Sequence, residues 1–126
     1  MVDLIIEKTK STPYVYLSQT ENTLIIEGES FPENSAKFYA PVLDWLKEFV
    51  AQLEVEKVEL EFEIVYFNSS TSKVFMTIFD LLEAAVENGK NISVIWRCDE
   101  QNETAIECGE EFKEDLDSLP FDIVIA

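Results

Sequence analysis

Hydrophobic and polar positions alternate most regularly between Val58 and Phe67. Three glutamates stand between the apolar residues there, and the apolar or aromatic set is Val58, Leu60, Phe62, Ile64 and Tyr66. A period of two is typical of a strand with one buried face. Strands covered on both faces show unbroken apolar runs instead, so the pattern predicts helices on one side of the sheet.

Shorter apolar and β-branched runs predict further strands. A polar stretch of five residues between two of these runs predicts a β-hairpin, and Gly28 is expected to end its second strand. The predicted strands besides Val58–Phe67 are Asp3–Glu7, Tyr14–Leu17, Thr23–Glu27, Asn91–Trp96 and Phe121–Ile125.

Apolar residues spaced by threes and fours predict three helices. The first is expected to begin near Pro32, with Ser30 as a candidate cap, and to end at about Gln52 or Leu53. Its predicted inward stripe is Phe38, Val42, Trp45, Leu46, Phe49 and Leu53. Pro41 should kink or divide this helix because proline lacks a backbone donor. The other predicted helices are Val74–Asn88, closed by Gly89 in a left-handed cap, and Glu103–Leu116.

The order of elements predicts the topology. The strands ending at Phe67 and Trp96 flank one helix, and a right-handed crossover makes such strands parallel. With no repeat, linker or low-complexity segment, residues 1–126 are expected to form a single α/β domain. We predict a mixed sheet with helices mainly on one face.

The net charge of the chain limits the classes of partner that it can bind. Nine basic and 26 acidic side chains give a net charge of −17, a field that repels nucleic-acid backbones and anionic membranes. A basic protein surface is a better match, and self-repulsion favours a monomer or weak dimer. The N-terminus lacks the basic region of a signal peptide, and no apolar run could span a bilayer, so we expect a cytoplasmic protein.

Catalysis is disfavoured because the chain contains no histidine. Histidine is the commonest general base and the commonest metal ligand. Cys98 and Cys108 stand too far apart for a C-x-x-C pair and are expected to be ordinary reduced thiols. We therefore predict no enzyme activity, no metal and no cofactor.

Four hydroxyl residues, Ser69–Ser72, lie between a predicted strand and a predicted helix. Serine and threonine cap helices by accepting a free backbone N–H, which would use one of the four. The others would suit a protein kinase, because a helix N-terminus tolerates the added phosphate. Both interpretations, a cap and a phosphorylation switch, stay open on the residues alone.

A second cluster, Gly28–Asn34, precedes the first helix. Its residue types suit a turn, a helix start and capping by asparagine or glutamate. It does not match a phosphate-binding loop, since it has one glycine and no neighbouring lysine.

These clusters carry a resemblance to a known family. The chain resembles the SiaC family of bacterial regulatory phosphoproteins over nearly its whole length. The blocks that carry the resemblance are Ser11–Pro13, Gly28–Asn34, Asp44–Trp45, Tyr66–Ser70, Asp80–Glu83 and the Trp96 strand.

The resemblance implies a partner-switching protein. An unphosphorylated member binds and activates a diguanylate cyclase; a dedicated Ser/Thr kinase phosphorylates the hydroxyl residue after the motif asparagine, and a metal-dependent Ser/Thr phosphatase reverses this. That residue is Ser69 here, where the family usually has threonine, with Ser70 and Thr71 as alternates. The expected partner-binding residues are Glu33, Asn34, Tyr66, Asn68, Ser70 and Lys73.

Two other functions remain as alternatives. The segment Val58–Asn88 is also similar to anti-sigma-factor antagonist domains, which sequester a Ser/Thr kinase and carry a phosphorylated serine at the same kind of junction. A small ligand-binding or carboxylate enzyme domain would instead place Glu29 or Glu33 in a deep pocket.

Overall fold

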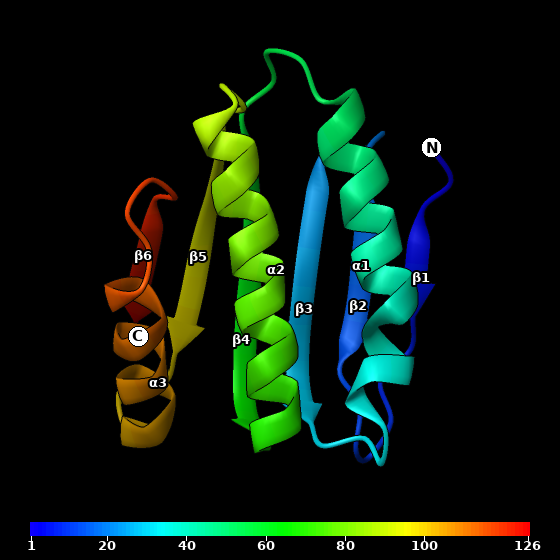
Figure 1. Ribbon diagram of the computed structural model, residues 1–126. Coiled ribbons are helices and arrows are strands. Elements are labelled where there is room, and N and C mark those ends of the chain that lie inside the picture. The colour runs from blue at the N-terminus through cyan, green and yellow to red at the C-terminus, as the bar shows by residue number, and fades with distance from the viewer.

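The computed structural model describes residues 1–126 as six strands and three helices (Figure 1). In chain order they are β1 (Leu4–Ile6), β2 (Tyr14–Ser18), β3 (Thr23–Ser30), α1 (Ser35–Gln52), β4 (Val58–Phe67), α2 (Ser69–Glu87), β5 (Ile92–Cys98), α3 (Glu103–Glu114) and β6 (Phe121–Ile125). The predicted order of elements is confirmed.

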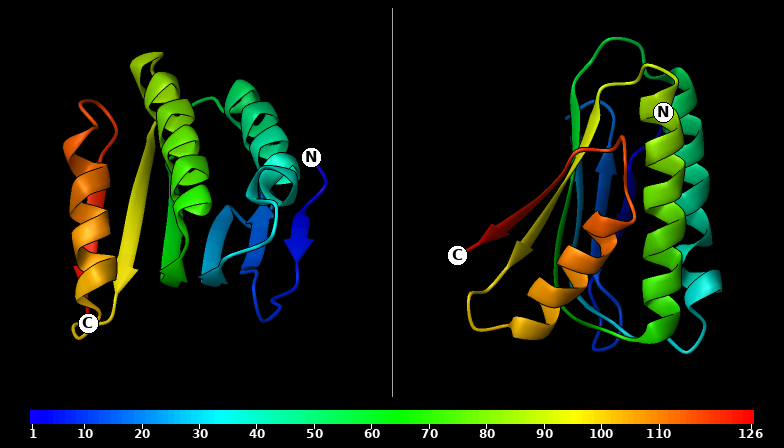
Figure 2. Two further views of the ribbon diagram at one scale, coloured as in Figure 1. Left: turned by 60° about the horizontal axis from the view of Figure 1, so that its bottom comes forward. Right: turned by 60° about the vertical axis from the view of Figure 1, so that its left-hand side comes forward.

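The strands form one sheet in sequential order from β1 to β6. The first three strands pair antiparallel, whereas β3 to β6 pair parallel, and Val58 of β4 lies opposite Ile92 of β5. All three helices cover the same face of the sheet, and the other face is open (Figure 2). This confirms the predicted α/β class, the mixed sheet and the one-sided helices.

The parallel half of the sheet sets where the helices begin. Each of β3, β4 and β5 is followed directly by a helix, so all three helix N-termini lie at the carboxyl edge of the sheet, at the bottom of Figure 1. At this edge the Asn68 N–H donates to the Ser30 carbonyl at 3.1 Å, and the hydroxyl of Ser35, next to Asn34, lies 2.8 Å from that of Ser70.

The core lies between the sheet and the helix layer and is rich in aromatic rings. Trp96 of β5 is fully buried at its centre. Its ring contacts those of Phe62, Phe67, Phe75, Phe112 and Phe121 at centroid distances between 5.4 and 6.3 Å. Such offset and edge-to-face pairs stabilise a core beyond the area they bury.

A β-bulge where β3 pairs with β4 accompanies two corrections, one on the faces of β4 and one on the end of β3. Gly28 pairs with Ile64 but Glu29 pairs with Tyr66, so Val65 is an extra residue that shifts the alternation by one. Tyr66, predicted on the buried face, is therefore 54% exposed, and Phe67 packs on Trp96 in its place. Gly28 does not end β3: it takes a φ of +121°, which favours glycine, and the strand continues to Ser30.

The start of α1 also differs from the prediction. Asn34 is the cap, accepting the Lys37 N–H at 3.0 Å, and the helix begins at Ser35 instead of near Pro32. Ser30, the predicted candidate cap, is buried at the end of β3. The predicted end at Gln52 or Leu53 is confirmed, since the helix ends at Gln52 and Leu53 follows as its C-cap.

Pro41 does not divide α1, which is continuous from Ser35 to Gln52. The carbonyl that loses its partner belongs to Lys37, and both residues are exposed, so water can satisfy it. The inward stripe is confirmed except at its first member, because Tyr39 is fully buried and Phe38 only partly.

The other helices need smaller corrections. Helix α2 begins at Ser69, five residues before the predicted Val74, and Gly89 follows it with the left-handed φ of +93° that was predicted. Helix α3 ends at Glu114, two residues before the predicted Leu116. None of the three helices combines the length and apolarity that a membrane crossing requires.

Candidate functional site

Ser69 is the first residue of α2 and does not cap it. The cap is Asn68, whose side-chain oxygen accepts the Thr71 N–H at 3.0 Å. The Ser69 side chain is exposed and makes no hydrogen bond. The cap interpretation of the hydroxyl cluster is therefore wrong for Ser69, which is left without a structural task.

Thr71, one of the alternate phosphorylation positions, is fully buried. Its hydroxyl donates to the Ser30 carbonyl at 3.1 Å and lies 3.0 Å from the Ser30 hydroxyl and 3.2 Å from that of Ser35. A kinase could reach this oxygen only if the start of α2 separated from β3 and α1.

Ser70, the other alternate, is exposed but occupied by hydrogen bonds. Its hydroxyl donates to the Asn68 side chain at 3.0 Å and lies 2.8 Å from the Ser35 hydroxyl. Ser70 therefore joins the start of α2 to the start of α1. Among the three candidates, only Ser69 presents a free hydroxyl to solvent.

These contacts belong to one hydroxyl network that joins β3, α1 and α2, formed by Ser30, Ser35, Tyr39, Ser70 and Thr71. At its inner end the Tyr39 hydroxyl lies 2.6 Å from that of Ser30. Burial raises the pKa of Tyr39 far above its usual range, with a smaller opposing effect from Ser30, so the phenol stays neutral. This network was not predicted, because no local pattern in the sequence links Ser30, Ser35 and Tyr39 to α2.

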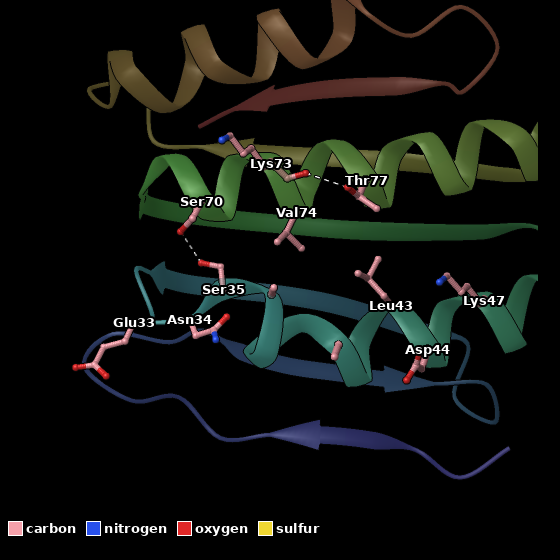
Figure 3. Close-up of a pocket in the computed structure, with 12 residues that line it drawn as sticks. Glu33, Asn34, Ser35, Leu43, Asp44, Lys47, Ser70, Lys73, Val74 and Thr77 are labelled. Carbon is pink, nitrogen blue, oxygen red and sulfur yellow. Dashed lines mark hydrogen bonds between the residues drawn. The ribbon is translucent and has the colours of Figure 1, made fainter.

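A groove of about 570 Å³ runs between α1 and α2 and begins beside Ser70 (Figure 3). We call it the α1–α2 groove. Its lining residues are Glu33, Asn34, Ser35, Ala36, Ala40, Leu43, Asp44, Lys47, Ser70, Lys73, Val74 and Thr77. Leu43 and Val74 point toward one another across it, and the Ser35–Ser70 hydrogen bond closes its end nearest the sheet edge (Figure 3).

The structure brings four of the six predicted partner-binding residues together in this groove: Glu33, Asn34, Ser70 and Lys73. Asn68 is half-buried beside it, with its side chain engaged in capping. Tyr66 lies outside the groove and packs edge-on against Phe31, with ring centroids 5.7 Å apart. The groove residues of the middle of α1, such as Ala40 and Lys47, were missed.

The remaining chemistry of the molecule gives little support to an active site. No group of three metal-ligating side chains is close enough to hold an ion. Cys98 and Cys108 are free thiols, and burial raises the pKa of both, which lowers their thiolate fraction. Glu33 lies at the exposed end of the groove, and Glu29 pairs with Tyr66 in the sheet.

Residues 6–126 match the sequence model of the SiaC family regulatory phosphoproteins. The chain belongs to the SiaC family. Members are regulatory phosphoproteins and not enzymes, so the predicted absence of catalysis agrees with the family.

Solved structures of SiaC from Pseudomonas aeruginosa have the same fold over the whole chain. One is 36% identical with a TM-score of 0.91 and full coverage of both chains. Another, of apo-SiaC, is 37% identical with a TM-score of 0.87, covering 98% of this chain and 99% of that one. A protein of Pseudomonas aeruginosa strain UCBPP-PA14 is 40% identical over 123 residues, covering 98% of this chain and 96% of its own length.

A further structure holds the diguanylate cyclase SiaD of Pseudomonas aeruginosa in complex with its activator SiaC. The present chain is 39% identical to the matched chain of that structure, with a TM-score of 0.91. The match covers 98% of the present chain and all of the matched one. The SiaC family thus includes an activator of a cyclase that makes cyclic di-GMP.

Proposed function

We propose that this protein is a partner switch that binds and activates a diguanylate cyclase when unphosphorylated and releases it when Ser69 is phosphorylated. The observation that carries the proposal is the state of Ser69. Among the three candidate phosphorylation residues, Ser69, Ser70 and Thr71, it alone has a hydroxyl that is exposed and free of hydrogen bonds. The solved complex of the related SiaC with a cyclase supports the choice of partner.

The position of Ser69 at a helix start makes phosphorylation compatible with the fold. Positive potential at the N-terminus of α2 favours an anion there. Lys73 lies four residues further on, on the same side of the helix, and can approach a phosphate on Ser69. Phosphorylation therefore changes the surface of the protein without unfolding it.

The charge that a phosphate adds to Ser69 can affect a partner only at short range. A phosphate adds about two negative charges to a chain that already carries −17. Charges are screened over roughly 8 Å at physiological salt. The long-range field therefore hardly changes, and release of a partner requires that the partner cover Ser69 or its immediate neighbours.

The surface around Ser69 contains the proposed partner-binding residues. These are Glu33, Asn34, Tyr66, Asn68, Ser70 and Lys73, all at or near the carboxyl edge of the sheet. We further infer that a cytoplasmic Ser/Thr kinase and a metal-dependent Ser/Thr phosphatase act on Ser69 at this edge. The kinase must compete with the cyclase for unphosphorylated Ser69, whereas the phosphatase acts on the phosphorylated protein, which has already released the cyclase.

The test is calorimetric binding to the organism's own homologue of SiaD, with cyclase activity measured in parallel. Ser69→Ala should keep affinity, activation and melting temperature, and should resist the kinase. Phosphorylated Ser69 should lose the cyclase while its melting temperature stays unchanged. Ser69→Asp should show an intermediate loss, since it has one charge fewer and another geometry.

Asn68→Ala is the matched control beside Ser69. Loss of the cap should lower stability by about 1 kcal/mol, a change in melting temperature that Ser69→Ala should not show. Equal affinity of the cyclase for the phosphorylated and unmodified protein would contradict the proposed switch at Ser69.

A further inference from the structure

The buried stripe of α2 contains one polar residue, Thr71. The other buried residues of the helix are apolar: Phe75, Ile78, Phe79, Leu82 and Ala85. Valine has the shape of threonine without the hydroxyl, so it would fill the same space in the core. A buried hydroxyl costs free energy unless it is paired, and apolar replacement of a buried hydrogen-bonded pair can be nearly neutral. Packing alone therefore does not explain a threonine at this position.

The hydrogen bonds of Thr71 form a directed chain, because each hydroxyl has one proton to donate. The Thr71 proton goes to the Ser30 carbonyl, so the Ser30 hydroxyl must donate to the Thr71 oxygen. The Ser30 oxygen then accepts from the Tyr39 hydroxyl, which lies 2.6 Å away. The chain runs from Tyr39 of α1 through the end of β3 to the first turn of α2. It therefore fixes where α2 begins relative to both elements.

Further hydrogen bonds hold the residues on either side of Ser69. The Asn68 N–H donates to the Ser30 carbonyl at 3.1 Å, the same oxygen that accepts the Thr71 hydroxyl. The Asn68 side-chain oxygen accepts the Thr71 N–H and the Ser70 hydroxyl, each at 3.0 Å. The backbone around Ser69 is thus held from both sides, while its own hydroxyl stays free.

Phosphoryl transfer is sensitive to the direction of the accepting hydroxyl. The Ser69 oxygen bonds to the γ-phosphorus of ATP while the bond to the ADP oxygen breaks, and the hydroxyl proton passes to a base of the kinase. The attacking and leaving oxygens lie roughly in line, so the rate depends on positioning. A displacement of about 1 Å can lower such a rate about 100-fold. The orientation of the first turn of α2 therefore affects how fast Ser69 reacts.

We propose that Thr71 is a positioning residue for the phosphorylation of Ser69. Its hydroxyl, held by Ser30, fixes the first turn of α2 against β3, so that the Ser69 hydroxyl meets the kinase in one orientation. Thr71 and Ser30 are fully buried, so a kinase bound at the surface does not touch them and their effect passes through Ser69. This inference rests on the proposed function and adds the residues that prepare its phosphorylation site.

The first experiment measures the rate of Ser69 phosphorylation over a range of protein concentrations, with ATP and a cytosolic extract of the native organism as the source of kinase activity. Thr71→Val should lower the maximal rate about tenfold and leave the half-saturating concentration unchanged, because no surface residue changes. Thr71→Ser keeps the hydroxyl and should restore most of the rate. The matched control is Ile78→Val, a methyl deletion in the buried stripe of the same helix. It should lower the melting temperature without changing the rate.

The second experiment measures the geometry without the kinase, from the backbone amide NMR signals of Ser69 and Ser70. These signals should shift or broaden in Thr71→Val and return to their wild-type positions in Thr71→Ser. Tyr39→Phe removes one oxygen at the far end of the chain. It should lower the maximal rate by a smaller factor than Thr71→Val, and it replaces that variant if Thr71→Val does not fold.

Several results would overturn the positioning role while leaving the proposed function intact. They are a wild-type or faster rate in Thr71→Val and Tyr39→Phe, unchanged amide signals in Thr71→Val, no recovery in Thr71→Ser, and an equal loss of rate in Ile78→Val. Absence of Ser69 phosphorylation in the wild-type protein would overturn the proposed function itself, and this inference with it.

Discussion

Ser69, Ser70 and Thr71 are adjacent in the chain and chemically alike, yet the structure gives them three different environments. Ser69 is free and exposed, Ser70 links α2 to α1, and Thr71 is buried in the hydroxyl network. A helix turns by about 100° per residue, so three consecutive side chains at its start necessarily face different surroundings. At this scale, the position on the helix decides which hydroxyl is available for phosphorylation.

Gly109 is a position where packing requires that a side chain be absent. It lies inside α3, where glycine is less favourable than alanine by about 1 kcal/mol. A Cβ atom at this position would lie 2.6 Å from Cδ1 and 2.7 Å from Nε1 of Trp96. That indole is fully buried and donates to the Ala105 carbonyl at 2.9 Å, so it cannot easily move. The glycine is thus explained by the space that Trp96 needs.

Gly109→Ala should therefore destabilise the protein despite the better helix propensity of alanine. Overpacking against Trp96 is expected to cost about 1–3 kcal/mol, which exceeds the propensity gain of about 1 kcal/mol over most of that range. Urea unfolding monitored by tryptophan fluorescence measures the difference. Glu110→Ala, the exposed neighbour, should change stability by less than about 0.5 kcal/mol. A Gly109→Ala protein more stable than the wild type would contradict this account.

Between elements, Glu83 connects α2 to the segment that precedes β6. Its Oε1 accepts the backbone N–H groups of Asp117, Ser118 and Leu119 at 2.7, 2.6 and 3.2 Å. These bonds, with that from Ser118 first, lower the pKa of Glu83 below its ordinary value. One carboxylate of α2 thus holds the loop between α3 and β6.

The lowered pKa predicts a pH dependence of stability. Because the charged form of Glu83 is favoured in the folded state, its contribution is fully present above its unfolded pKa of about 4.3. This contribution is lost as the pH falls through the lower pKa that Glu83 has in the folded protein. Glu83→Gln should therefore reduce the melting temperature at neutral pH and lessen its decrease below about pH 4.3. The exposed control Glu110→Gln should leave the melting temperature at neutral pH and its decrease in acid unchanged. Equal changes in Glu83→Gln and Glu110→Gln would contradict the assignment of this pH dependence to Glu83.

For the whole molecule, the net charge of −17 governs association. The open face of the sheet exposes apolar side chains such as Ile5 and Val65, but neighbouring glutamates of β4 oppose the approach of a second copy. We expect a monomer or a weak dimer at neutral pH in moderate salt, with association increasing as salt screens the repulsion. Light scattering over a range of salt concentrations checks this expectation, and a stable tetramer in moderate salt would contradict it.

The local pattern was sufficient for the elements and their order. Alternation between Val58 and Phe67 determined the bounds of β4 and the one-sided helix layer, because burial on one face imposes a period of two on any strand. The parallel pairing of β4 and β5 followed from the handedness of the crossover. The blocks around Asn34 and Ser69 were sufficient for the family.

Only the tertiary structure decided the details of the site. The bulge beside Gly28 reversed the faces of Tyr66 and Phe67, because register depends on the partner strand and not on the strand itself. The hydroxyl network joins Ser30 to Thr71 across 41 positions of sequence, and the α1–α2 groove exists only where two helices pack together. Contacts between distant segments leave no local periodicity, so the hydroxyl network and the α1 side of the groove became visible only once the chain was folded.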